Sequence, residues 1–304
     1  RVRSSKSRRG SAKRIMGPIP RTFRLRAPAY DLDATLSSGQ AFRWRVAGSV
    51  WTGVIRDRWV QLRSVGNEIE ARTVAGAEDR SVLAAYLQTG VDQNVILATF
   101  PRDPVLAEAV STAPGLRILR QDPWECLASF LLSSTKQIVQ IRQIIEILCQ
   151  RLGPPLLTPA GFPAAHGFPS AARVAEASER LLRACRTGFR APYLLATARA
   201  VATGQFSLAE LGLLPLPAAR LRIQELPGVG PKIADCVLLF AYGRTEAFPI
   251  DVWIERVLRQ GYFAGREVPR RALLDFAAAH FGVHAGHAQQ FLFHWARLRA
   301  GRRA

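Results

Sequence analysis

The sequence predicts an α+β protein, in which a small antiparallel β-sheet domain precedes a larger, all-helical part. The first observation is that residues 30–75 contain short runs of aromatic and β-branched side chains with partial alternation, which is typical of strands. The second is that apolar residues recur from about residue 80 onward at the helical spacing i, i+3, i+4 and i+7.

The length and composition predict a folded protein of more than one unit. At roughly 100–200 residues per domain, 304 residues correspond to two or three packed units. Apolar residues make up 48% of the chain, which excludes a wholly disordered protein. No apolar run approaches the roughly 20 residues that cross a bilayer, and the N-terminal segment lacks the apolar core of a signal peptide. We therefore expect a cytoplasmic protein without a membrane partner.

The first residues are strongly basic. Residues 1–26 hold ten basic and no acidic side chains and show no hydrophobic period, so we expect a disordered tail over residues 1–23. This tail is either an upstream extension without a role or an arm that tethers the protein to DNA. Residues 27–304 keep 32 of the 42 basic side chains against 23 acidic ones, a net charge of +9. A basic folded part is consistent with a nucleic-acid partner.

The N-terminal β domain is predicted over residues 24–118. Its expected strands are the runs at 42–46, 49–58, 58–65 and 66–74. Flanking helices are expected at 81–90 and 103–112.

The helical part is predicted over residues 119–304. Its first helices are expected at 123–134 and 136–153, and a loop rich in proline and glycine follows at 153–170. We expect helical segments from there to the end of the chain.

Two glycines mark a corner between helical runs at about 216–225 and 231–241. Gly228 and Gly230 allow positive φ and a close approach of the backbone to a ligand. The second helix begins with free N–H groups and the positive end of its dipole, which together attract an anion such as a DNA phosphate. A plain corner between two helices explains the glycine spacing equally well.

Lys232 lies at the start of this second helix, and Asp251 follows 19 residues later. The chain contains four lysines against 38 arginines, so a lysine within such a segment is notable. The helix dipole favours the neutral amine, which is the nucleophilic form of a lysine. Lys232 and Asp251 can serve as nucleophile and electrostatic partner, although the residues alone favour a structural ion pair.

Six segments resemble the 8-oxoguanine DNA glycosylase branch of the helix-hairpin-helix glycosylases, which share a Gly/Pro-rich loop and an essential aspartate. They follow the family's order: SGQAFRW (38–44), LRQDPWECLASF (119–130), HGFPS (166–170), GFRAPY (188–193), LPGVGPKIADC with PIDV (226–236 and 249–252) and AGHAQQFLF (285–293). The resemblance covers roughly residues 24–298. It implies that the corner at 216–241 is a helix-hairpin-helix motif.

The resemblance implies roles for Lys232 and Asp251. Lys232 would attack the sugar C1′ and form a Schiff base, which an arginine cannot do because it stays protonated. Asp251 would stabilise the positive charge that develops on the sugar as the glycosidic bond breaks.

The resemblance also implies how a flipped-out base is read. Oxidised guanine carries a hydrogen on N7, and the carbonyl of Gly39 would accept it. Cys236 and Phe293 would sandwich the ring, and Gln289 would read its Watson–Crick edge. Without the resemblance, ordinary core packing explains Cys236 and Phe293 better.

Further positions correspond to DNA contacts of the family, and several depart from its pattern. Phe189 would fill the gap in the duplex, where tyrosine is commoner, and Arg190 would contact the orphaned cytosine. Gln140 replaces a second cytosine-reading arginine, which predicts weaker discrimination of the opposite base. Thr135 and Lys136 replace an Asn-rich turn of the family, and Trp253 replaces a phosphate-contacting histidine. These three residues, together with Gly228 and Gly230 in the hairpin, are the remaining proposed DNA contacts.

No metal or other cofactor is expected. The four cysteines, which lack CxxC spacing, are expected to be free and mostly buried, and no iron–sulfur cluster is expected. Four histidines gather near the end of the chain, but glycines interrupt their segment and no cysteine lies near. These residues are Cys126, Cys149, Cys185 and Cys236, and His280, His284, His287 and His294.

The resulting hypothesis is a monomeric, bifunctional DNA glycosylase and abasic-site lyase that excises 8-oxoguanine from double-stranded DNA. Such an enzyme would be associated with the nucleoid in a bacterium or lie in the nucleus of a eukaryote. One alternative is a monofunctional glycosylase for alkylated purines, which would need no lysine at position 232. The other is a non-catalytic helix-hairpin-helix protein that binds damaged DNA, which the pairing of Lys232 with Asp251 disfavours.

Overall fold

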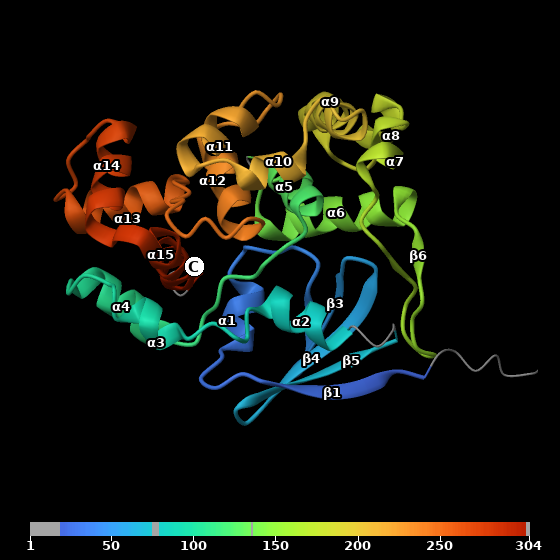
Figure 1. Cartoon of the computed structure of the whole chain (residues 1–304), viewed down its shortest axis with the longest axis horizontal. Coiled ribbons are helices and arrows are strands. Elements are labelled where there is room, and N and C mark those ends of the chain that lie inside the picture. Colours follow the sequence, from blue (N-terminus) through green and yellow to red (C-terminus); the bar gives the residue numbers. More distant parts are fainter. Residues whose placement is uncertain (1–18, 75–78, 135, 302–304) are drawn as a thin grey trace, which may run out of the picture.

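The computed structural model describes residues 19–74, 79–134 and 136–301. Its N-terminal part contains a five-stranded antiparallel sheet with the strand order β1-β5-β4-β3-β2. The strands are β1 (Arg21–Arg26), β2 (Arg45–Ala47), β3 (Val50–Ile55), β4 (Arg58–Val65) and β5 (Glu68–Thr73). Figure 1 shows this sheet at one end of the molecule and most of the helices beyond it. The predicted α+β class is confirmed, because this sheet precedes a helical remainder.

The first strand lies partly within the predicted disordered tail, which is therefore corrected from Arg21 onward. In β1, Arg21 pairs with Thr73 and Arg26 with Glu68 of β5. These pairings use backbone hydrogen bonds, so an edge strand rich in arginine can form without a strong hydrophobic alternation. Residues 1–18 of the predicted tail lie outside the described residues.

A short helix interrupts the region that the sequence predicts as strands. Helix α1 (Leu32–Ser37) begins after Asp31, whose carboxylate accepts the N–H of Ala34 at 2.8 Å. An aspartate at this position satisfies one of the unpaired N–H groups of the first turn, and this local signal outweighs the strand propensity of the region. Helix α1 positions the segment Ser38–Gln40, which enters the functional site.

The sheet packs its inner face against α1 and α2 (Asp79–Leu87). Its core includes Trp44, Leu62 and Leu83, all almost completely inaccessible to solvent. Burying such side chains stabilises the fold by about 1.5–3 kcal/mol each. The core continues into the helical part through Leu119, which immediately precedes the first long helical region.

The helical part contains the predicted long helices and several short ones. The helices are α3 (Gln93–Leu97), α4 (Pro104–Thr112), α5 (Pro123–Leu132), α6 (Ile138–Leu152), α7 (Ala171–Ala175), α8 (Glu179–Ala184), α9 (Ala191–Ala202), α10 (Leu208–Leu213), α11 (Leu216–Ile223), α12 (Pro231–Phe240), α13 (Val252–Tyr262), α14 (Arg270–Phe281) and α15 (Ala285–Gly301). The Pro/Gly-rich loop contains two short strands, β6 (Pro155–Leu156) and β7 (Ala165–His166), which pair with each other.

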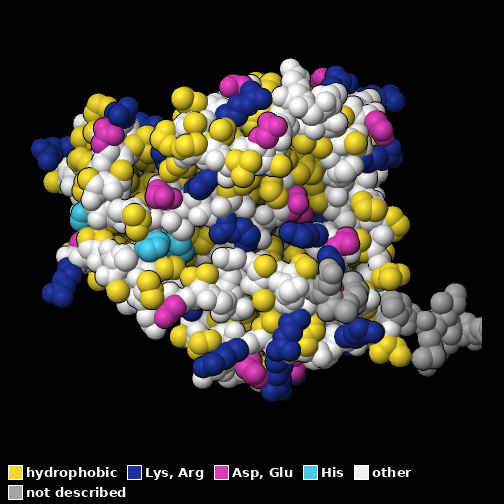
Figure 2. Space-filling view, in the orientation of Figure 1, with side chains coloured by type: hydrophobic (Ala, Val, Ile, Leu, Met, Phe, Trp, Pro, Cys, Tyr) yellow, Lys and Arg dark blue, Asp and Glu magenta, His cyan; other side chains and the backbone are white. Residues whose placement is uncertain are grey.

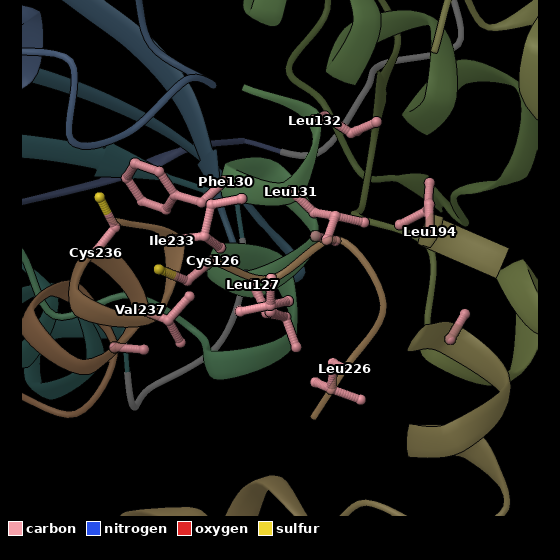
Figure 3. Close-up of a cluster of buried hydrophobic side chains, with 14 of the residues drawn as sticks. Cys126, Leu127, Phe130, Leu131, Leu132, Leu194, Leu226, Ile233, Cys236 and Val237 are labelled. Atoms are coloured by element: carbon pink, nitrogen blue, oxygen red, sulfur yellow. The ribbon is translucent and has the colours of Figure 1, made fainter. Parts of the chain in front are cut away.

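Two hydrophobic cores hold the helices together. In the first, α5 packs on α12, with Leu127, Phe130 and Cys236 among the side chains that Figure 3 shows between them. In the second, α4 packs on α15, with Leu106 against the same core as Leu292. Because α4 belongs to this second core, the packing is continuous across the predicted domain boundary at residue 118.

No helix within the described ranges has the length and apolarity that a membrane-spanning segment requires.

Candidate active site

A cavity of about 860 Å³ lies between the end of α5, helix α12, the start of α13 and helix α15. It brings together residues from widely separated parts of the chain. Eight of the residues predicted for catalysis or DNA contact line it: Gly39, Lys136, Lys232, Cys236, Asp251, Trp253, Gln289 and Phe293.

Lys232 lies in the first turn of α12 and is only partly exposed. Its Nζ lies 3.4 Å from the Ser133 hydroxyl, to which it donates a weak hydrogen bond, and 5.2 Å from the centre of the Phe130 ring. No ion pair joins Lys232 to Asp251 or to another carboxylate within the described residues. The structural ion pair that the sequence left open is therefore not formed, and the amine is available to a ligand in the cavity.

Asp251 is the residue that caps α13. Its Oδ1 accepts the N–H groups of Trp253 at 3.0 Å and of Ile254 at 2.9 Å. Burial raises the pKa of Asp251 above its usual value, whereas the N–H of Ile254 and the charge of Lys232 lower it. The cap fixes the direction of the carboxylate, and one of its oxygens remains for a charge that develops in the cavity.

Gly39 adopts a left-handed conformation with φ of +80°. A Cβ at this position would lie 2.7 Å from Cδ1 of Ile138 and 3.2 Å from Cε1 of Phe293. The positive φ and the lack of room for a Cβ therefore both require glycine at position 39, beside the Phe293 ring that lines the cavity.

Gln40 holds the Gly39 segment in place, a role that the residue pattern alone does not predict. Its side chain is 1% exposed and donates from Nε2 to the carbonyls of Thr35 (3.1 Å) and Arg117 (2.8 Å). Its Oε1 accepts the N–H of Leu119 at 2.8 Å. Because both ends of the amide form hydrogen bonds, Gln40 anchors its segment to helix α1 and to the segment at 117–119. The only sequence signal was its place within SGQAFRW.

Cys236 and Gln289 present different chemistry to the cavity. Burial raises the pKa of the Cys236 thiol to about 12, so the thiol stays neutral and acts as a small apolar surface. Gln289 is 5% exposed, and its Oε1 is buried with no hydrogen-bond partner in the described chain. A buried acceptor without a hydrogen-bond donor lowers the stability of the fold, so Oε1 of Gln289 indicates a ligand that donates a hydrogen bond to it.

The family models match almost the whole described chain. Residues 23–127 match the 8-oxoguanine DNA glycosylase N-terminal domain. Residues 128–276 match the HhH-GPD superfamily of base excision DNA repair proteins. The chain belongs to the 8-oxoguanine DNA glycosylase family.

Relatives in other organisms support this membership along most of their length. A probable N-glycosylase/DNA lyase of Methanothermobacter thermautotrophicus is 30% identical, over 88% of this chain and 94% of the relative. The N-glycosylase/DNA lyase OGG1 of Arabidopsis thaliana is 30% identical, over 86% of this chain and 76% of the relative.

A solved structure shows the same fold. The Clostridium acetobutylicum 8-oxoguanine glycosylase/lyase, in complex with double-stranded DNA containing cytosine opposite 8-oxoguanine, superimposes with a TM-score of 0.85. The two chains are 30% identical, and the match covers 90% of this chain and 93% of that one.

In this glycosylase chain, the predicted hairpin is formed by α11 and α12, with the two glycines in different environments. Gly228 has a φ of +79°, and a Cβ there would lie 2.9 Å from the Tyr193 ring. Gly230 caps α12, and a Cβ there would meet only open space. A partly buried ion pair between Arg220 and Asp235, at 2.6 Å, joins the two helices. Gly230 therefore leaves the start of α12 open to an approaching phosphate.

Phe189 and Arg190 lie in a short 3-10 turn, apart from the cavity. Phe189 is 55% exposed, whereas Arg190 is 1% exposed and lies 4.3 Å from the centre of the Phe189 ring. An exposed aromatic side chain suits a wedge that replaces lost base stacking. Arg190 must move out from beneath Phe189 before it can contact a base.

The three polar positions before and within α6 differ in their surroundings. Thr135 lies outside the described residues. Lys136 is exposed at the mouth of the cavity. Gln140 is exposed outside the cavity, and its Oε1 accepts the N–H of Gln137 at 3.1 Å, which caps α6. Since the carbonyl oxygen accepts this bond and the residue is exposed, the amide N–H groups of Gln140 remain as donors for a ligand.

The histidines near the C-terminal end do not gather around one point. His280 contacts Asp103 at 2.9 Å, and His284 contacts Thr99 at 2.9 Å. Among the described residues, no group of three potential ligands could hold a metal ion. All four cysteines are buried and free.

Replacing Gly39 with alanine is expected to lower the rate of 8-oxoguanine excision at least about tenfold, or roughly 1.4 kcal/mol. The added methyl group requires a strained backbone and displaces the Phe293 ring or Ile138. Single-turnover excision measures the effect. Gly66→Ala is the control, because Gly66 also has positive φ but open space around it and lies in a distant β-turn. Equal losses in both variants would contradict a specific role for Gly39.

Proposed function

We propose that this chain excises 8-oxoguanine from double-stranded DNA and then cleaves the strand at the abasic site. The carrying observation is that one cavity holds the amine of Lys232, which forms no ion pair among the described residues, and the capped carboxylate of Asp251, beside Gly39 and the unsatisfied Gln289. The relatives described above, named as N-glycosylase/DNA lyases, support both activities. The protein is therefore a DNA repair enzyme with glycosylase and lyase activity.

The chemistry begins with Lys232. Its amine attacks C1′ of the flipped-out nucleotide, the glycosidic bond breaks, and the base leaves with the bonding electron pair and a proton. Opening of the sugar ring then gives a protonated Schiff base between Nζ and C1′. Loss of a proton from C2′ expels the 3′ phosphate, and water releases the enzyme. The carboxylate of Asp251 stabilises the positive charge on the sugar and on the Schiff base.

Recognition of the base uses the rest of the cavity. The carbonyl of Gly39 accepts the N7 hydrogen that distinguishes 8-oxoguanine from guanine, and Oε1 of Gln289 accepts a hydrogen bond from the Watson–Crick edge. The neutral thiol of Cys236 and the ring of Phe293 pack on the two faces of the base. Phe189 fills the gap that the base leaves in the duplex.

Two alternatives have less support. A monofunctional glycosylase for alkylated purines uses water as the nucleophile, so it does not explain an amine held free of carboxylates in the cavity. A protein that only binds damage does not explain why the carboxylate of Asp251 lies in the same cavity.

Strand cleavage without alkali tests the proposed pair of activities. The protein is incubated with an end-labelled duplex containing one 8-oxoguanine, and the products are separated with and without hot alkali. We expect a cleaved strand without alkali. Cleavage that appears only after alkali would indicate the monofunctional enzyme, and an intact strand under both conditions would indicate the binding protein.

Discrimination of the opposite base is expected to be weak. Gln140 stands where the family carries a cytosine-reading arginine, and its outward amide offers fewer donors than a guanidinium. Single-turnover excision of 8-oxoguanine opposite each of the four bases measures this. A preference for cytosine above about a hundredfold, roughly 2.7 kcal/mol, would contradict it. Gln140→Arg should strengthen the preference for cytosine.

The partner is duplex DNA that contains oxidised guanine, and we propose that one copy of the chain acts alone. We further propose that the enzyme works wherever the cell keeps its chromosomal DNA.

A further inference from the structure

A second cavity, of about 390 Å³, lies behind the wall of the active-site cavity. The same two helices line both. On α12, Leu239 faces the second cavity and Cys236 the first, and on α15, His287 faces the second and Gln289 the first. The remaining wall comes from α3 and the residues just before it, from the segment at 117–120, from the loop after α12 and from His284. None of the residues assigned to catalysis or DNA contact lines this second cavity.

Three buried side chains on this wall carry polar atoms without a partner. Gln93 and Arg117 are each 5% exposed, and His287 is 8% exposed. Both amide atoms of Gln93, Nη1 of Arg117 and Nδ1 of His287 are buried and lack a hydrogen-bond partner within the described chain. Gln93 and Arg117 also border an adjoining hollow, but the three meet at this cavity. Each such atom costs about 1–3 kcal/mol unless something occupies the space beside it.

The wall also carries an excess of positive charge. Arg117 and Arg120 both line the cavity, and burial lowers the pKa of each. Nη2 of Arg117 donates weakly to the carbonyls of Pro28 and Ala29, both at 3.4 Å and both bordering the adjoining hollow, so Nη1 is the atom of Arg117 that remains for a ligand. Neither arginine forms an ion pair in the part of the chain that the structure describes. The carboxylate of Asp92 lies nearby, but it accepts the N–H of Asn94 at 2.9 Å and caps α3. Burial, the neighbouring His284 and these two arginines lower the pKa of His287 to about 3, so His287 adds no charge itself.

Apolar side chains make up much of the remaining lining, among them Val95, Ile96, Ile118 and Leu239, and the polar side chains of Gln88, Thr245 and His284 complete it. Two neighbouring arginines bind a carboxylate or phosphate group, and apolar walls bind the apolar part of a ligand. An amide without a partner binds a group that both donates and accepts hydrogen bonds. The volume lies within the usual range for small-molecule sites, about 300–1,000 Å³, and exceeds what an inorganic ion fills. We propose that this cavity binds a small organic anion, with its carboxylate or phosphate on Arg117 and Arg120 and its polar edge on Gln93.

Calorimetric titration of the enzyme–DNA complex tests this site. The enzyme is first saturated with a duplex that carries a tetrahydrofuran abasic analogue, so that the active site and the DNA-binding face are occupied. Deoxyguanosine monophosphate, citrate and deoxyguanosine are then titrated in turn. We expect at least one of the two anions to bind saturably, with a Kd below about 1 mM. The comparison of phosphate with carboxylate identifies the preferred head group, and uncharged deoxyguanosine should bind at least about tenfold more weakly than the preferred anion.

Variants then locate the binding. Arg120→Gln should weaken the preferred anion at least about tenfold, because Arg120 is partly exposed and its side chain makes no hydrogen bond that the fold requires. Gln93→Leu, a second variant, should weaken it severalfold. Arg151→Gln is the matched control, because Arg151 is exposed on α6 and lines none of the cavities described above. It should bind like the wild type, and thermal melting checks that every variant is folded.

Three results would overturn the proposal. The first is that neither anion binds the DNA-saturated enzyme. The second is that deoxyguanosine binds as tightly as the preferred anion, because the negative charge of the ligand would then contribute nothing to binding. The third is that folded Arg120→Gln binds like the wild type, which would place the anion elsewhere on this basic protein.

Discussion

Replacing Lys232 with glutamine is expected to lower the single-turnover rate of 8-oxoguanine excision at least about a thousandfold, roughly 4 kcal/mol. Glutamine keeps a similar length and polarity but lacks the amine that attacks C1′. In the structure, the amine contacts the Ser133 hydroxyl, the Phe130 ring and the Cys236 thiol, and its loss breaks no ion pair among the described residues. We therefore expect the variant to fold normally and to bind the 8-oxoguanine duplex within a few-fold of the wild type.

Lys136→Gln is the control for the loss of charge. Lys136 also borders the cavity, but it is exposed at the mouth. This variant removes one positive charge from the same surface, so DNA binding should weaken while excision falls by less than about tenfold. If Lys232→Gln and Lys136→Gln lost activity equally, the loss would result from the missing positive charge alone, and Lys232 would not be the nucleophile.

Replacing Asp251 with asparagine should produce the second largest loss, about 100- to 1,000-fold in the excision rate, or roughly 2.7–4 kcal/mol. Asparagine has the same shape and caps a helix as well as aspartate does. The hydrogen bonds to Trp253 and Ile254 therefore remain, and the variant removes the negative charge alone. Single-turnover excision and thermal melting are measured on the same preparation.

Asp251→Ala separates the cap from the charge. Alanine removes both, so its excision rate should match that of Asp251→Asn, while its stability falls by about 1 kcal/mol through the lost cap. If Asp251→Asn kept activity within about tenfold of the wild type, then the carboxylate would serve only to begin α13.

The architecture was largely predictable, because long amphipathic helices and aromatic strands carry strong local signals. The helices predicted at 123–134 and 231–241 are found as α5 and α12. Two departures have identifiable causes, one local and one from pairing between distant segments. The Asp31 cap produces α1 within a region of strand-like composition, and β1 owes its place to backbone pairing with β5, which a single sequence does not reveal. Helix α4 packs on α15 through a tertiary contact that periodicity cannot predict.

The candidate site was predictable only in part. Residue chemistry alone singled out Lys232 and Asp251, but it favoured an ion pair between them, and the structure shows none. Gly39 and Gln289 lie about 250 residues apart in the sequence, so only the fold or a family resemblance brings them together. The roles of Gln40, which anchors the Gly39 segment, and of the second cavity depend on which buried polar atoms find partners. That information exists only in three dimensions.

Trapping with sodium borohydride tests the central claim most directly. The enzyme is mixed with the 8-oxoguanine duplex and the reductant, and a covalent adduct is isolated on a denaturing gel and mapped by mass spectrometry. The proposed mechanism predicts an adduct joined through Nζ of Lys232 and no adduct with Lys232→Gln. Excision without any adduct, or an adduct that maps to another amine, would contradict it.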